Sequence, residues 1–225
     1  MDWIEQWLPN AVRYWPRIVT SLIETLQMVG IALAFVVPLG VLLGILLLVV
    51  APGHLYENRL LDAIVPRVVN LMRSIPFVIM IAVIIPFTRL VAGTAVGVPG
   101  AVVPIIVALV PFVARQVELA LADVDRGVID MALSLGFSRP YVIGRVLLKE
   151  GRSGIVRALV LSSISLVGYT AMAGVVGGGG IGDLAIRYGY ARFMPDITLI
   201  SLILLLVIVF ALQGAGNLVL RRTSH

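Results

Sequence analysis

Five long apolar stretches dominate this chain of 225 residues, at about residues 18–50, 74–92, 98–121, 155–176 and 196–220. Each is near the ~20 residues that an α-helix needs to cross a hydrocarbon core of ~30 Å. Hydrophobic residues make up 60% of the chain and charged residues 13%, against about 45–50% and about 25% in soluble domains. So much apolar surface cannot be buried in a water-soluble fold of this size. The sequence therefore predicts an all-α membrane protein with five transmembrane helices.

Several kinds of chemistry are excluded by residue types that are missing or isolated. The chain has no cysteine, so a disulfide, a thiolate nucleophile and a Cys-ligated metal are ruled out. Lys149 is the only lysine, and its neighbours Leu148 and Glu150 do not form the Gly-Lys-Ser/Thr sequence of a P-loop. The two histidines, His54 and His225, are far apart in the sequence. We therefore expect no catalytic residues, no metal and no cofactor in this chain.

The basic residues predict the orientation of the chain in the membrane. Most of the 17 Lys and Arg residues lie on the side of segment 122–154 and of the C-terminus. Because positively charged loops stay in the cytoplasm, we expect segment 122–154 and the tail 221–225 to be cytoplasmic. The segment 1–17 is then external, and residues 18–220 form one membrane domain. The same rule explains the net charge of +5 without a nucleic-acid partner.

Segment 122–154 is predicted to form a helical hairpin. Asp125 is a suitable N-cap for a short helix that ends at Gly136. Ser138 is a suitable N-cap for a second helix, with Pro140 in its first turn. Helical spacing places apolar residues on one face, namely Ile129, Ala132, Leu133, Val142, Ile143, Val146 and Leu147.

Three interpretations of this hairpin compete. It is either a solvated loop packed under the bundle, a DNA-binding helix-turn-helix, or a docking element for a cytosolic protein. Both of its ends are tethered to membrane spans and its second helix is short, which disfavours DNA binding. The other two interpretations stay open on the residues alone.

The hairpin resembles the "EAA" loop of ABC-importer permeases. That pattern is Glu-Ala-Ala, three residues, Gly, nine residues and Ile-x-Leu-Pro, and Ala132, Gly136 and Leu148 match it at the right spacing. The departures are Asp130, Met131, Val146 and Lys149. In that family the loop sits in a cleft of a separate ATPase subunit. The resemblance implies that the coupling contacts are made by Asp130, Ala132, Gly136, Arg139, Val146 and Leu148.

Further motifs are similar to the branch of this family that takes up methionine. They are Arg73-Ser74-Ile75-Pro76-Phe77, Ile85-Pro86-Phe87-Thr88-Arg89, Pro111-Phe112-Val113-Ala114-Arg115, Leu166-Val167-Gly168-Tyr169-Thr170-Ala171-Met172-Ala173-Gly174 and Gly177-Gly178-Gly179-Gly180-Ile181-Gly182-Asp183. The resemblance runs from about Glu24 to Gly216. It implies a type I ABC-importer permease fold in a bacterial inner membrane, two cytoplasmic ATPase subunits and an extracytoplasmic methionine-binding protein. Because five helices are few to enclose a path, we expect a homodimer with the path on its two-fold axis.

The fourth apolar stretch is the most polar of the five. Its candidate pathway residues are Ser162, Ser165, Tyr169, Thr170 and Met172. Hydroxyls in a membrane helix serve either interhelical hydrogen bonds or a polar pathway, and the two interpretations are equally open for the serines. For Tyr169 the pathway is favoured.

Two glycine patterns are predicted to be structural. Gly177, Gly179 and Gly182 satisfy the dinucleotide pattern G-x-G-x-x-G, but they follow a membrane helix rather than a strand. We expect them to form a flexible exit from the fourth span. Gly40 and Gly44 form a G-x-x-x-G pattern, which favours close packing of the first span.

Ionisable residues are predicted to lie toward the ends of the spans. A charge near mid-bilayer is costly and usually marks ion coupling. Arg115 and Glu118 are three residues apart and are expected to pair. Two alternatives to an ATP-driven permease are kept: a self-sufficient ion-coupled carrier, for which sodium sites on broken helices stay open, and a membrane scaffold without transport activity.

Overall fold

The computed structural model describes residues 8–223, and these are helical apart from short connections, with no strand among them. The helices in chain order are α2 (Pro9–Arg13), α3 (Trp15–Val50), α4 (Arg59–Ser74), α5 (Phe77–Val83), α6 (Ile85–Ala92), α7 (Gly97–Ala122), α8 (Arg126–Ser134), α9 (Arg139–Tyr141), α10 (Leu148–Glu150), α11 (Arg152–Ala173), α12 (Gly180–Asp183) and α13 (Pro195–Thr223). Three π-helical segments join some of them, η1 (Val142–Leu147), η2 (Gly174–Gly178) and η3 (Leu184–Tyr190). The predicted all-α class is confirmed. Parts of the predicted terminal segments 1–17 and 221–225 lie outside the described residues.

Four helices within residues 8–223 are long and apolar enough to cross a membrane: Trp15–Val50, Gly97–Ala122, Arg152–Gly178 and Pro195–Arg222. A fifth span exists if the pair α4 and α5, bent by 103° at its break, is counted as one. The prediction of one continuous helix over residues 74–92 is wrong. Pro76 precedes α5, and Pro86 lies in the first turn of α6, after a break at Ile84. A proline is tolerated at the start of a helix, where the N–H groups have no partner within the helix, and α5 and α6 begin at these two prolines.

The amphipathic helix α4 is not revealed by mean hydropathy, because its apolar and charged residues average out. It carries Pro66 in its interior and both signs of charge, with Asp62 in its first turn and Arg73 in its last. Val69 is its buried residue. Val69 and Val65 pack against neighbouring side chains, whereas the apolar side chains of Leu60, Ile64, Val68 and Leu71 are exposed.

The chain divides into two compact units, which are described separately. The first comprises the described residues up to Phe35, Ile75–Ala108 and Ser163–Leu212. Its core includes Ala11, Ile18, Leu184 and Ile197, contributed by α2, α3, η3 and α13. Asp196 fastens α2 to the start of α13, because its carboxylate accepts hydrogen bonds from the backbone N–H groups of Asn10 (2.9 Å) and Ala11 (3.2 Å).

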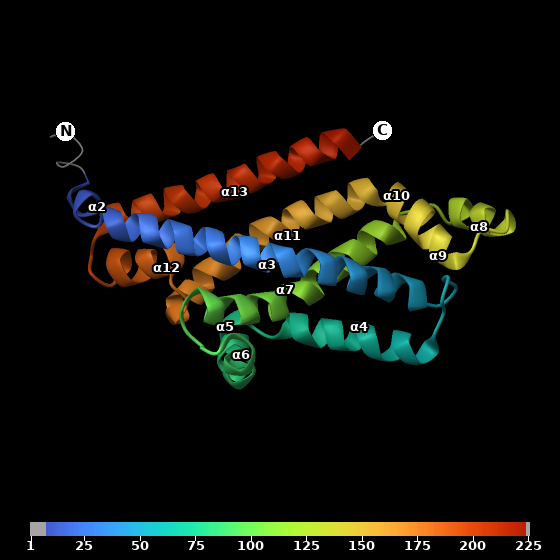
Figure 1. Cartoon of the computed structure of the whole chain (residues 1–225), viewed down its shortest axis with the longest axis horizontal. Coiled ribbons are helices and arrows are strands. Elements are labelled where there is room, and N and C mark those ends of the chain that lie inside the picture. Colours follow the sequence, from blue (N-terminus) through green and yellow to red (C-terminus); the bar gives the residue numbers. More distant parts are fainter. Residues whose placement is uncertain (1–7, 224–225) are drawn as a thin grey trace. The chain divides into compact units, whose positions relative to one another are not determined.

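The second unit comprises Val36–Ser74, Leu109–Ser162 and the described residues from Gln213. Leu47, Val69 and Ala114 form one of its core clusters, so α4 returns along the C-terminal half of α3 (Figure 1). The G-x-x-x-G pattern packs closely, as predicted. A Cβ built on Gly40 would lie 2.5 Å from Val113, and one built on Gly44 would lie 2.7 Å from the carbonyl oxygen of Ala114.

Candidate functional site

The hairpin of segment 122–154 forms as its capping residues predict. The carboxylate of Asp125 accepts a hydrogen bond from the N–H of Gly127 at 2.8 Å and so caps α8. Gly136 follows α8 with φ +84°, a left-handed conformation that favours glycine. Ser138 is the N-cap of α9, although its side chain makes no capping hydrogen bond. The second arm differs from the expectation, because it continues from α9 as the π-helical segment η1 before α10.

The predicted apolar face of this hairpin is mostly turned inward. Ile129, Ala132, Val142 and Leu147 are buried within the second unit. This agrees with the interpretation that the hairpin packs under the bundle, and it means that Ala132 does not offer its side chain to a partner. The other predicted coupling residues are more accessible: Asp130, Gly136 and Arg139 are exposed, and Val146 and Leu148 are half-buried.

A second apolar surface faces outward, and Leu133 is its one member from the predicted apolar face. It comprises Met131, Leu133, Leu135, Phe137 and Tyr141, and we call it the hairpin tip. The rings of Phe137 and Tyr141 stack with their centroids 4.7 Å apart. The spacing of Met131 and Leu135, four residues apart on the opposite face of α8, is the sequence signal for this surface. The hairpin therefore both packs inward and presents an apolar tip.

A cationic cluster lies at the root of the hairpin. The guanidinium of Arg126 donates to His54 Nε2 at 3.1 Å, and the guanidinium of Arg139 lies over the ring of Tyr56 at 5.5 Å. Burial, and then the charge of Arg126, lower the pKa of His54 below its ordinary value. His54, Arg126, Arg139 and Asp130 line a cavity of about 190 Å³ between the loop after α3 and α8. The cluster thus connects α8 and the start of α9 to that loop.

The candidate pathway residues lie along α11 and its C-terminal end, and two of their hydroxyls bond within their own helix. Ser162 donates to the carbonyl of Ala158 at 2.7 Å, and Thr170 donates to that of Val167 at 2.8 Å. A serine or threonine hydroxyl readily reaches a carbonyl one turn earlier on its own helix, and the choice between a packing role and a pathway role for these two residues stays open. Ser165 is half-buried.

Tyr169 and Met172 have different surroundings. The ring of Tyr169 meets that of Phe77 edge to face, with centroids 4.6 Å apart and an interplanar angle of 77°. This contact joins α11 to the start of α5 within the first unit. Met172 is 50% exposed, so its thioether remains available for contact.

The glycine run forms the exit from the fourth span as a tightly turned segment, and its predicted flexibility stays a prediction. Gly177, Gly179 and Gly180 have φ values of +96°, +78° and +76°. A Cβ on Gly174 would lie 2.6 Å from the backbone nitrogen of Asp183, because the chain folds back on itself here. The glycines permit both the left-handed turns and this close approach.

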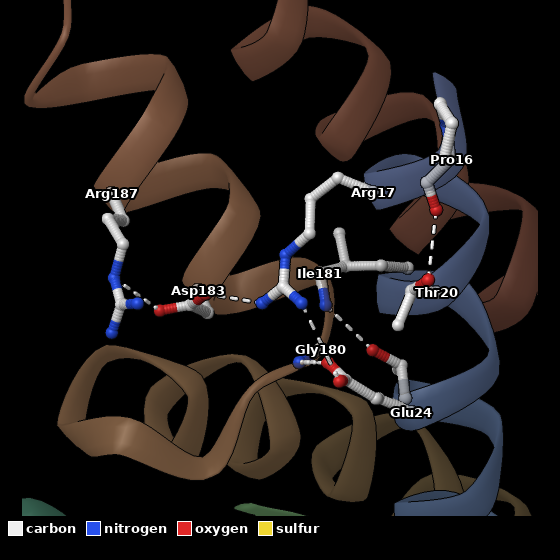
Figure 2. Close-up of polar contacts among 9 residues, drawn as sticks. Pro16, Arg17, Thr20, Glu24, Gly180, Ile181, Asp183 and Arg187 are labelled. Atoms are coloured by element: carbon white, nitrogen blue, oxygen red, sulfur yellow. Dashed lines mark hydrogen bonds and ion pairs between the residues drawn. The ribbon is translucent and has the colours of Figure 1, made fainter. Parts of the chain in front are cut away.

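A polar network fastens this segment to α3 (Figure 2). The N–H of Gly180 donates to Glu24 at 2.6 Å, and the N–H of Ile181 donates to the hydroxyl of Thr25 at 2.8 Å. Arg17 donates to the carboxylate of Asp183 at 3.0 Å. The side chain of Asp183 is only 5% exposed.

Each side of this network also has an ion pair of its own. Arg17 lies 3.8 Å from Glu24 on α3, and Arg187 lies 3.0 Å from Asp183. The sequence pattern did not single out Arg17 or Asp183. The signal for Asp183 is an acidic residue directly after a glycine-rich apolar run, and its partner is 166 residues away in the chain.

Arg115 and Glu118 pair as predicted, with one guanidinium nitrogen 2.8 Å from both carboxylate oxygens. Both residues lie on α7 in the second unit. The pair is three residues apart on one helix, so it neutralises two charges locally.

The chain is similar to known transport proteins over nearly its whole length. Residues 36–225 match the family described as binding-protein-dependent transport system inner membrane component. A probable D-methionine transport system permease protein, MetI, from Vibrio cholerae is 40% identical over 221 residues, which cover 96% of this chain and 98% of that protein. The methionine import system permease protein MetP of Bacillus subtilis is 38% identical over 174 residues, or 77% of this chain and 78% of that one.

Solved structures agree with these relatives. A structure of the MetNI methionine ABC transporter in inward-facing conformations contains a chain with a TM-score of 0.91 and 37% identity. The match covers 95% of this chain and 99% of that chain. A solved amino acid ABC transporter, at 19% identity and a TM-score of 0.76, shares the fold.

Proposed function

The chain belongs to the binding-protein-dependent transport system inner membrane component family, so it is a membrane-embedded transport subunit, and we propose that the solute it carries is methionine. The observation that carries this proposal is the 40% identity to a D-methionine transport permease over 96% of the chain. The structural match to a methionine ABC transporter, with a TM-score of 0.91, supports the same solute.

In this proposal the chain works as a homodimer with two cytoplasmic ATPase subunits and an extracytoplasmic methionine-binding protein. The chain has a single lysine and no P-loop, so ATP hydrolysis resides in the partner subunits. Residues 18–220 form the transmembrane domain, the segment 1–17 is external, and segment 122–154 and the tail 221–225 are cytoplasmic. This orientation rests on the basic residues concentrated on the side of the hairpin.

The hairpin is the coupling element. Its tip supplies exposed apolar side chains that a groove of the ATPase subunit buries, and Asp130, Gly136 and Arg139 supply an exposed rim. Val146 and Leu148 belong to the second arm. Because they are half-buried, they couple a displacement of the hairpin to the rest of the unit. Ala132 acts by packing beneath the tip.

The pathway residues on α11 have distinct roles in this proposal. Met172, half exposed, and Tyr169, held by Phe77, contact the side chain of methionine. Ser165 lies one turn before Tyr169 on the same helix, along the path. Ser162 and Thr170 keep the wall of the path apolar, because their hydroxyls are bonded to their own backbone.

Reconstituted uptake tests the function. The complex purified from native membranes, placed in proteoliposomes with its binding protein, is expected to accumulate labelled methionine only with ATP, and ionophores are expected to have no effect. Uptake by the chain alone under an ion gradient would indicate the self-sufficient carrier. Absence of flux, with a stoichiometric partner that lacks nucleotide-binding motifs, would indicate the scaffold.

A substitution at the hairpin tests the coupling role. Gly136→Asp places a side chain on a left-handed residue in the exposed turn and is expected to abolish ATPase binding and uptake. Gly144→Asp is the matched control, because it adds the same charge on the second arm where no atom lies within 4 Å of a new Cβ. Equal binding by both variants would contradict the assignment.

A further inference from the structure

The polar network at the glycine run is organised as two local ion pairs joined by a few contacts. On α3, Arg17 and Glu24 are two turns apart and pair at 3.8 Å. On the other side, Asp183 pairs with Arg187 one turn later at 3.0 Å. The polar contacts between the sides are the Arg17–Asp183 bond and the two hydrogen bonds from the N–H groups of Gly180 and Ile181 (Figure 2), and Ile18 of α3 also shares a core cluster with Leu184.

This arrangement allows the two sides to separate without stranding a charge. A buried carboxylate that loses its partner is strongly destabilising. If the Arg17–Asp183 bond breaks, Asp183 keeps Arg187 and Arg17 keeps Glu24. Each charge therefore has a partner in the joined state and in the separated state, which is what a reversible contact requires.

The segment that is held depends on these contacts for its order. Residues 174–183 comprise η2, which is kinked at Val176 and Gly177, and the short helix α12. Within this segment Gly177, Gly179 and Gly180 have left-handed backbones. Glycines lose more conformational entropy on ordering than other residues do. Loss of the contacts to α3 therefore frees residues 174–183.

We propose that Arg17 and Asp183 form a reversible latch, which holds residues 174–183 on α3 at rest and opens during transport. Arg17 is then a positioning residue for the transport cycle. The latch rests on the proposed function, because it assigns a step within ATP-driven uptake.

Hydrogen exchange of the intact complex tests the latch directly. The amides of Gly180 and Ile181 donate to α3 only while the latch is closed. A peptide covering residues 176–184 is expected to exchange faster in the vanadate-trapped complex than in the resting one. The same rate in both states, with uptake intact, would overturn the proposal.

Two variants separate the latch from a merely structural contact. Arg17→Gln removes the bond between the sides and is expected to speed resting exchange of this peptide about tenfold or more, the effect of losing one charge-assisted hydrogen bond. It is also expected to lower the methionine transported per ATP hydrolysed. Arg187→Gln has the opposite effect on exchange, because it leaves the buried Asp183 without a partner once the two sides separate, so resting exchange of this peptide is expected to be slower than in the wild type.

Rescue by the conservative variant completes the test. Arg17→Lys keeps a cation beside Asp183. It is expected to restore most of the methionine transported per ATP hydrolysed. Arg17→Gln could lower thermal stability without changing hydrogen exchange in the resting and vanadate-trapped complexes or the methionine transported per ATP. The contact would then be structural, and the latch would be refuted. Failure of the wild type to take up methionine with ATP would instead refute the proposed function, and the latch with it.

Discussion

Replacing Gly44 by alanine tests whether the close approach of α3 and α7 is as tight as the structure indicates. A Cβ at this position would lie 2.7 Å from both the carbonyl oxygen of Ala114 and the Cβ of Val117. Atoms in favourable contact are about 3.5–4.0 Å apart. One obstacle is backbone and the other is the first atom of a stiff side chain, so the new methyl group must displace the helix itself.

The magnitude follows from comparison with a second glycine of the same helix. Alanine is favoured over glycine inside a helix by about 1 kcal/mol, and this gain applies equally to Gly44→Ala and Gly30→Ala. No atom lies within 4 Å of a Cβ built on Gly30. The difference between the variants is therefore the cost of overpacking alone, about 1–3 kcal/mol. For a chain of this size, 2 kcal/mol corresponds to about 4–8 °C in the melting temperature.

The assay is thermal melting of the detergent-solubilised protein, followed by size-exclusion chromatography. Gly30→Ala is expected to melt at or slightly above the wild type, and Gly44→Ala several degrees below Gly30→Ala. Gly40→Ala is expected to fall between them, because its nearest obstacle is the Val113 side chain at 2.5 Å, part of which can rotate. Equal melting of the Gly44 and Gly30 variants would refute the reasoning.

Two further predictions concern the hairpin and its root. Asp125→Ala removes the capping bond to Gly127 and is expected to destabilise α8 by about 1 kcal/mol. ATPase binding, measured by co-purification, is then expected to weaken. Asp125→Asn keeps an accepting oxygen and is expected to retain ATPase binding. The pKa of His54 is lowered in the folded state, so the folded protein favours the neutral ring. The free energy of unfolding is therefore highest above the pKa of the unfolded chain and falls as the pH drops below about 6.5. The melting temperature of the wild type is expected to drop more than that of His54→Gln between pH 7.5 and 5.5, and parallel curves would show that the ring does not titrate on unfolding.

The hairpin shows why some parts of the site were predictable. Its caps are local, since Asp125 and Gly136 act within a few residues of their own positions, and both behave as the sequence predicts. Which face of the hairpin is buried is not decided by neighbouring residues in the sequence. Ala132 is buried and Met131 exposed because of what packs against α8, and nothing in the spacing of apolar residues alone tells which of two apolar faces meets the rest of the unit.

The amino-acid sequence by itself determined the membrane location, the all-α class, the approximate places of four spans and the Arg115–Glu118 pair. These follow from segment composition and from helical periodicity, which act over a few turns of one helix. The tertiary structure decided the breaks around Pro76 and Pro86, the inward side of the hairpin and the order of the glycine run. Arg17 and Asp183 are separated by 166 residues, and a charge pair across that distance exists only when packing has brought its two helices together.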